Sequence, residues 1–184
     1  MTGLQLFRTS AKYGAYLGLF MCVFTLFMWL SELDTTYYHV GKNLDLLVSI
    51  VPAAMILYAI YKLKRNMNLS VTQRILIGIT VGMVSVLIST PFIEIYHNFI
   101  NPEWFNAVLR VQENKMVEAG VSLSDINARL EQLRAGNTIY NAVLNAVVFG
   151  GIVFPAIIST ISLIIIRNKK KDELENENSL YIHL

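Results

Sequence analysis

Two ionisable side chains, Glu94 and His97, carry the strongest chemical signal in this sequence. They are three residues apart, so a helix would place both on one face. A carboxylate and an imidazole together can ligate a metal ion or pass a proton. A protein metal site needs three or four ligands, however, and this pair supplies only two. The sequence therefore favours structural pairing or solvation over metal binding or proton transfer.

Further polar side chains are predicted at the same end of the molecule. Asn141 and Asn145 are four residues apart at the start of the last hydrophobic run, and would share a helix face. Ionisable groups inside a bilayer are costly, which makes them candidates for function. We expect only Glu94 to be buried, since the other ionisable members lie near the ends of their runs. The candidate polar site comprises Glu94, His97, Asp45, Asn141 and Asn145.

Motifs for catalysis or cofactor binding are missing from the sequence. It has no phosphate-binding loop, nucleophile elbow, His-Glu-x-x-His motif or dinucleotide fingerprint. The single cysteine, Cys22, excludes an intramolecular disulfide and a cysteine metal cluster. The net charge of +2 is too small to indicate nucleic acid. We therefore expect a protein that is not an enzyme, has no cofactor and has no nucleic-acid partner.

Four hydrophobic runs would position these side chains. The chain is 54% hydrophobic and 15% charged, whereas soluble domains are about 25% charged. The runs cover residues 13–30, 44–61, 75–96 and 138–166, and a helix of about 20 apolar residues crosses a bilayer. We predict an all-α integral membrane protein with four transmembrane helices in a single domain, residues 1–184. The last run is the longest, so its first turns should project from the bilayer and pack on the preceding segment.

That preceding segment, residues 101–136, predicts two amphipathic helices. The first begins at Asn101, a capping residue followed by proline, and ends at Gly120. The second begins at Ser122, with an acid three residues on as in a capping box, and ends at Gly136. The sequence thus predicts an amphipathic helical hairpin inserted between spans three and four.

Apolar residues on the hairpin define a candidate interaction surface. Those of the first helix fall within one arc, and those of the second form a narrower seam of Leu123, Ile126, Leu130 and Leu133. The two helices could close on each other and on the base of the last span. Alternatively, the aromatic face of the first could lie in the lipid interface. The candidate surface comprises Trp104, Phe105, Val108, Leu109, Leu123, Ile126, Leu130 and Leu133.

Glycine pairs and prolines recur along the spans. Gly14 and Gly18 in the first span, like Gly78 and Gly82 in the third, are four residues apart. This spacing permits close helix crossings, and packing within one chain is the simpler explanation than a homodimer contact. The second and fourth spans each contain a proline followed by alanine. The alternation is compatible with an internal duplication or with chance, since glycine and proline are common in spans.

Basic residues beside the spans predict the orientation. Ten of the 15 Lys and Arg residues flank the N-terminus, the second connection and the C-terminus. Such residues mark the cytoplasmic side. We therefore expect both termini in the cytoplasm and the hairpin 101–136 in the periplasm of a bacterial inner membrane. Residues 172–184 are polar and acidic, and are expected to form a mobile tail.

Over nearly its whole length the chain resembles a Bacteroidetes-type bacterial membrane family, domain of unknown function 4199. The resemblance implies four spans with a helical insertion before the last, and it brings neither a function nor catalytic residues. The features that carry it are Lys12-Tyr13-Gly14 opening span one, the Tyr96-to-Pro102 exit from span three, Met116 ahead of Gly120, Ser122 with Ile126, and the closing Ile166-Arg167.

The leading functional hypothesis is a non-enzymatic accessory or interaction protein that offers its hairpin to a partner, or uses it as a lid. The alternative is a small transporter, or an ion- or proton-linked membrane protein, that uses Glu94. Such a protein would be oligomeric, because four kinked helices alone make a narrow pathway. A membrane enzyme is the third hypothesis. The expected partners are the lipid bilayer and either another protein or further copies of this chain.

Overall fold

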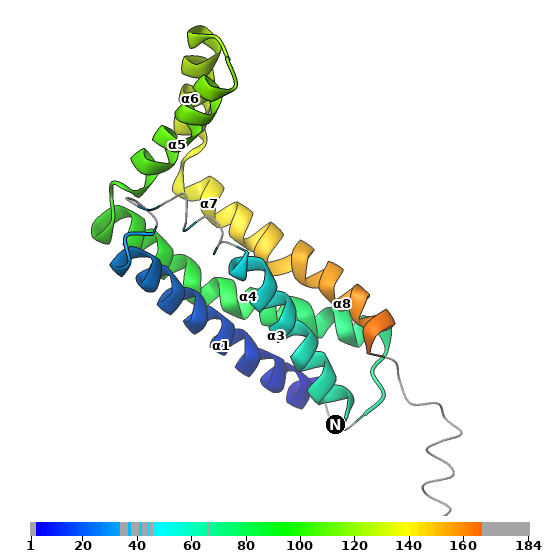
Figure 1. The fold of residues 1–184 in the computed structure, drawn as a ribbon. Coiled ribbons are helices and arrows are strands. Elements are labelled where there is room, and N and C mark those ends of the chain that lie inside the picture. Colours follow the sequence, from blue (N-terminus) through cyan, green and yellow to red (C-terminus); the bar gives the residue numbers. More distant parts are fainter. Residues whose placement is uncertain are drawn as a thin grey trace, which may run out of the picture.

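The computed structural model is a helical bundle with an arm at one end (Figure 1). It describes residues 3–33, 37, 41, 44, 46–65 and 67–166. Asp45 and the predicted tail 172–184 lie outside these residues. Over the described ranges there is no β-strand. The elements are α1 (Gly3–Leu30), α3 (Leu47–Lys64), α4 (Val71–Ile95), the π-helical segment η1 (Tyr96–Ile100), α5 (Trp104–Glu118), α6 (Leu123–Gly136), α7 (Ile139–Asn145), the π-helical segment η2 (Ala146–Val153) and α8 (Phe154–Ile165).

Four of the described helices are long and apolar enough to cross a membrane: Gly3–Leu30, Leu47–Lys64, Val71–Ile100 and Ile139–Ile165. The predicted all-α fold with four spans is therefore confirmed. The first helix begins at Gly3, well before the hydrophobic run, and the Ser10 hydroxyl donates to the Leu6 carbonyl within it. Hydropathy locates the part of a helix that sits in hydrocarbon, whereas hydrogen bonding decides where the helix begins.

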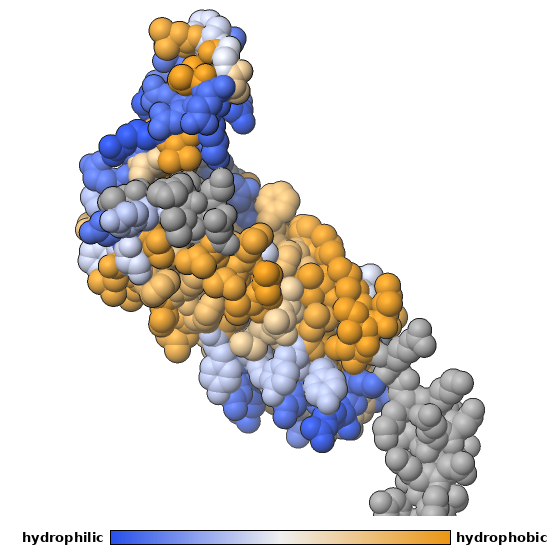
Figure 2. All heavy atoms as spheres, viewed as in Figure 1, coloured by the Kyte–Doolittle hydropathy of each residue, from blue (hydrophilic) through white to orange (hydrophobic). Residues whose placement is uncertain are grey.

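The hydropathy of the surface agrees with a membrane location. On the face drawn in Figure 2, hydrophobic residues cover the bundle between a hydrophilic arm and a hydrophilic opposite end. Large apolar side chains on the spans stay exposed, among them Leu87 at 67% and Ile164 at 76%. In water such exposure would be unfavourable, whereas in a bilayer these side chains contact lipid. The chain is a multi-pass membrane protein.

Helix α4 packs against α1 on one side and α8 on the other, and glycines set both contacts. A Cβ atom added at Gly14 would lie 2.7 Å from the Val81 carbonyl oxygen, and one at Gly82 would lie 2.9 Å from that of Gly151. No larger residue fits at either place. The prediction that the glycine pairs pack within the chain is confirmed. The glycine pair of α1 faces α4, whereas the pair of α4 faces the last span. The glycines therefore make different contacts in the two halves of the chain.

Arg74 joins the beginning of α4 to the end of α8. Its side chain is 2% exposed, and its guanidinium donates to the carbonyl oxygens of Ser162 at 2.9 Å and Ile166 at 2.7 Å. The Ser162 carbonyl also accepts from the Ile166 N–H, whereas the last carbonyls of a helix generally have no donor inside it. A cation there also interacts favourably with the negative end of the helix dipole. Arg74 therefore caps α8, a contact that the basic-residue count alone does not predict.

The last span is continuous from Ile139 to Ile165 and contains η2 immediately before Pro155. Proline has no N–H group, and a widened π turn is one way for a helix to absorb that loss. The first turns of this span, in α7, bury no residue, and Tyr140 is 73% exposed. The prediction that these turns pack on the hairpin holds only at its base, where the Asn141 side chain donates to the carbonyl of Gly136, the last residue of α6.

Candidate functional site

The hairpin has a small hydrophobic core of its own. Leu109 of α5 and Ile126 and Leu130 of α6 are buried, with Phe105, Met116 and Leu133 packed against them. The two helices thus close on each other, as in the first of the two predicted arrangements. Leu123, predicted in the same seam, is 72% exposed. That part of the prediction is wrong, because Leu123 is the first residue of α6 and lies beside the turn.

The turn between α5 and α6 is a Schellman motif. The Gly120 N–H donates to the Val117 carbonyl, and the Val121 N–H donates to that of Met116. Gly120 has a φ of +71°, which favours glycine. The Ser122 hydroxyl then accepts from the Asp125 N–H and caps α6. The predicted stop at Gly120 and start at Ser122 are confirmed.

Three apolar side chains stay exposed around this turn, and we call them the apolar tip: Val117 at 60%, Val121 at 38% and Leu123 at 72%. Figure 2 shows hydrophobic residues at the far end of the arm, separated from the bundle by hydrophilic ones. Sequence reasoning missed Val117 and Val121 as surface residues. Apolar residues on both sides of a glycine turn could have indicated them, because neither helix extends far enough to cover the other there.

The junction between α4 and the hairpin is fixed by two side-chain contacts. Asn101 is 5% exposed and donates from its side-chain amide to the Tyr96 hydroxyl at 2.9 Å. The predicted cap at Asn101 is therefore wrong: α5 begins at Trp104, after an N-cap at Glu103 without a side-chain hydrogen bond. The rings of His97 and Trp104 stack at 4.0 Å between centroids and 12° between planes.

The predicted polar site is brought together only in part. Glu94 and His97 both line a cavity of about 300 Å³ between the end of α4 and the base of the hairpin. Asn141 instead donates to the Gly136 carbonyl at 3.0 Å, and Asn145 is exposed. Across the described residues, no group of three or more His, Cys, Asp or Glu side chains could hold a metal ion. Of the four predicted site residues that the structure describes, only Glu94 and His97 line this cavity.

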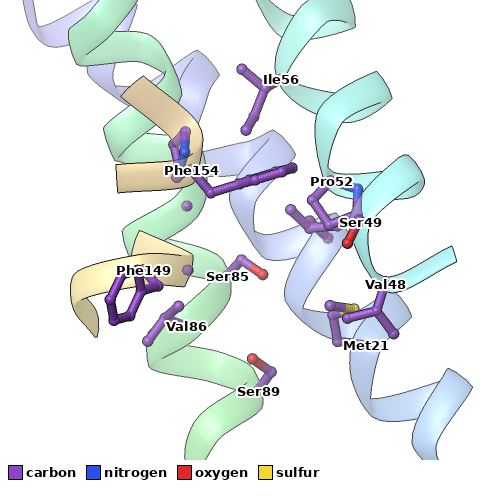
Figure 3. A pocket seen from close by; sticks show the side chains of 14 residues that line it. Met21, Val48, Ser49, Pro52, Ile56, Ser85, Val86, Ser89, Phe149 and Phe154 are labelled. Carbon is purple, nitrogen blue, oxygen red and sulfur yellow. The ribbon is translucent and has the colours of Figure 1, made fainter. Parts of the chain in front are cut away.

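A second cavity, of about 270 Å³, lies between the spans and is lined by residues from all four of them (Figure 3). Pro52 of α3 and Pro155 of α8 both contribute to its wall. Ser85 and Ser89 enter it from α4, and the Ser85 side chain points toward Pro52 and Ser49. Glu94 is not part of this wall. We call this space the central cavity.

The two α4 serines in the central cavity differ from three threonines of the spans. Thr25, Thr80 and Thr160 each donate to the carbonyl four residues earlier, at 2.7–2.9 Å. Ser85 and Ser89 are 6% and 7% exposed, and neither makes a hydrogen bond within the described part of the chain. The central cavity is therefore an apolar space with two hydroxyls available to a small molecule or to water.

Comparison with known proteins adds a family and nothing further. A family model described as "protein of unknown function (DUF4199)" matches residues 12–168. No curated protein matches the chain. No solved structure matches it either.

Proposed function

This chain belongs to the DUF4199 family, whose function is unknown, and we propose that it is a non-enzymatic interaction protein that presents its hairpin to a partner protein. The observation that carries the proposal is the apolar tip. The two hairpin helices form a hydrophobic core with each other. Val117, Val121 and Leu123 nevertheless stay exposed at the end of an arm outside the bundle. Exposed apolar groups rimmed by polar residues are typical of binding surfaces.

The charge around the tip favours a protein over a lipid surface. Residues 113–125 contain the acids Glu113, Glu118 and Asp125 and a single base, Lys115. An anionic bilayer would repel this excess of negative charge. The complementary partner is a protein with an apolar pocket bordered by basic side chains. The stacked His97 and Trp104 would hold the arm in place before binding, which reduces the entropy lost on association.

The proposed orientation places the hairpin outside, in the periplasm, and both termini in the cytoplasm. It is supported by the end of the bundle opposite the arm, where Lys62, Lys64 and Arg74 lie in the terminal turns of α3 and α4. In a Cys22→Ser background, an impermeant maleimide should label Asn114→Cys but not Arg65→Cys in intact cells. The reverse pattern contradicts the orientation.

Site-specific photo-crosslinking in living cells tests the partner. A photoreactive amino acid at Val117 or Leu123 should give one discrete protein adduct. The same residue at Arg129, which is exposed on α6 away from the tip, should not. A Val121→Asp substitution combined with the probe at Leu123 should abolish the adduct while the hairpin keeps its protease resistance. Adducts to lipid alone, or equal adducts at all three positions, contradict the proposal.

A second candidate function is the binding or transport of a small, mainly apolar molecule by the bundle. The central cavity supports it, with two hydroxyls to orient a ligand that carries one polar group. This differs from the predicted ion-linked transporter, since Glu94 lines the other cavity, at the base of the hairpin. Benzyl alcohol should raise the melting temperature of the wild-type protein in detergent, and the shift should vanish in Ser85→Ala/Ser89→Ala.

Two controls make the cavity experiment decisive. Thr80→Val removes a hydroxyl of the same helix that bonds to its own backbone, so it should leave the benzyl alcohol effect intact. Toluene, which lacks the hydroxyl, should act equally on wild type and on the double serine variant. An identical benzyl alcohol shift in every variant would mean that the alcohol acts through the micelle, and the candidate function fails.

A further inference from the structure

A groove between α1 and α3 has basic and aromatic residues at one end and apolar residues along the rest. Its volume is about 590 Å³. Lys12 and Lys62 enter from the two helices, accompanied by Tyr13, Tyr16 and Tyr58. The apolar part is formed by Ile50, Val51, Ala54 and Met55, all on α3. The basic end lies toward the end of the bundle that is remote from the hairpin (Figure 1).

Both lysines are held over tyrosine rings of their own helix. The Lys12 ammonium is 5.6 Å from the Tyr16 ring centroid, and the Lys62 ammonium is 5.7 Å from that of Tyr58. Across the groove, Tyr13 meets Tyr58 edge to face, with centroids 5.6 Å apart. Each cation–π contact restricts a flexible chain, and the tyrosine pair joins the two helices. The groove therefore presents two positive charges in a defined arrangement.

Within the described part of the chain, these charges have no acidic partner. The wall of the groove contains no aspartate or glutamate. Over the described ranges neither Lys12 nor Lys62 forms a salt bridge, and the one salt bridge found there joins Arg134 to Glu131 on the hairpin. Two cations next to hydrocarbon are costly without an anion. At the edge of a bilayer the available anions are lipid phosphates.

The length of the groove fits a lipid chain. Lys62 and Ile50 are twelve positions apart on α3, which corresponds to about 18 Å along a helix. One leaflet contributes about half of a ~30 Å hydrocarbon core. In Figure 2 the blue and pale residues lie at one end of the bundle, below the hydrophobic band. A ligand with its anionic group at the lysines would thus extend one apolar chain along α3.

We propose that this groove binds an anionic phospholipid from the leaflet at the amino-terminal end of the bundle. The phosphate lies between the Lys12 and Lys62 ammonium groups, and one acyl chain runs past Met55 and Ala54 toward Ile50. The tyrosine rings occupy the level of the glycerol backbone, where amphipathic aromatic residues are favoured. The site is independent of the hairpin and of the central cavity.

Native mass spectrometry of the protein released from mixed micelles tests this assignment. Dioleoyl phosphatidylglycerol should remain bound with about thirtyfold preference over dioleoyl phosphatidylcholine, because each lysine near an anionic headgroup contributes a factor of about five. Lys12→Gln/Lys62→Gln should abolish the preference. Lys64→Gln/Arg65→Gln removes the same charge at the same end of the bundle but outside the groove, and should retain it.

Three outcomes overturn the proposal. Equal loss in the two double variants would mean that the lipid responds to overall charge rather than to the groove. Equal retention of both lipids by the wild-type protein would mean that the lysines merely reach toward water. Inorganic phosphate that displaces the lipid at similar concentration would mean that the apolar part contributes nothing. Melting temperatures in phosphatidylcholine alone verify that both double variants remain folded.

Discussion

The bundle of four spans and the hairpin both consist of packed helices, but they differ in the residues at their closest helix contacts. Where α4 meets α8, Gly78 and Gly82 lie against Ser159 and Pro155, and many large apolar side chains of the spans are exposed, although the bundle also buries others such as Ile56. In the hairpin, large apolar side chains such as Leu130 point inward, and the polar ones are exposed.

The surrounding solvent explains the difference. In water, burying a leucine or isoleucine side chain stabilises a helix pair by about 1.5–3 kcal/mol. In lipid the same side chain gains little from burial, because acyl chains are equally apolar. Close backbone packing through small residues therefore contributes more to helix association there. The change from one kind of packing to the other occurs at Tyr96–Trp104, where the chain leaves the bundle.

The largest effect is expected from a substitution at the tightest helix contact. A Cβ atom at Gly78 would overlap the Ser159 hydroxyl and lie 2.8 Å from the Pro155 carbonyl oxygen. Gly78→Leu should therefore separate α4 from α8 and destabilise the bundle by about 3 kcal/mol or more. Gly136→Ala is the matched control, since nothing lies within 4 Å of its added Cβ. Similar melting temperatures for the two variants in detergent would contradict glycine-mediated packing.

The second effect should be large but confined to the hairpin. Leu130→Asp places an unpaired carboxylate in its core, where even truncation of a buried leucine costs about 2–5 kcal/mol. Protease should then cut between residues 101 and 136, while the spans stay in the membrane. Leu123→Asp, at an exposed position, should remain resistant. If both variants are cut alike, or neither is cut, the hairpin core described above is wrong.

A third substitution tests whether the spans depend on polar contacts as well. Arg74→Met should lower the stability of the bundle by about 3 kcal/mol or more, because two hydrogen bonds from a charged group are lost at about 1.5–3 kcal/mol each. The last turn of α8 should then exchange its amide hydrogens faster than the rest of that helix. Arg65→Met, an exposed arginine just after α3, serves as the control. Unchanged exchange in α8 would exclude the capping role.

The smallest effect is predicted where the two regions join. His97→Ala removes the stack on Trp104 and should cost about 0.5–1.5 kcal/mol. It should also increase the motion of the hairpin relative to the bundle, measured by distances between spin labels. Glu94→Gln changes a neighbour in the same cavity without touching the stack, and should leave both quantities unchanged. A larger effect from Glu94→Gln than from His97→Ala would restore Glu94 as the main residue of the cavity at the base of the hairpin.

Several features of this protein follow from the sequence alone, because they depend on neighbours along the chain. The hydrophobic runs predict the spans, since twenty apolar residues are stable only in a bilayer. Ser122 and Gly120 predict the ends of the hairpin helices, since capping bonds join residues a few positions apart. The same holds for Ile126 and Leu130, which share one face of a short amphipathic helix.

Other features were decided only by the tertiary structure. Asn101 bonds to Tyr96 instead of capping α5, and Leu123 lies beyond the reach of the opposite helix. Of the five predicted polar residues, Glu94 and His97 line one cavity, whereas Asn141 bonds to Gly136, Asn145 is exposed and Asp45 lies outside the described residues. These features share one physical reason. A span that is apolar all round carries no periodic signal for its packed face, so the choice of neighbour depends on which helices can approach most closely in three dimensions.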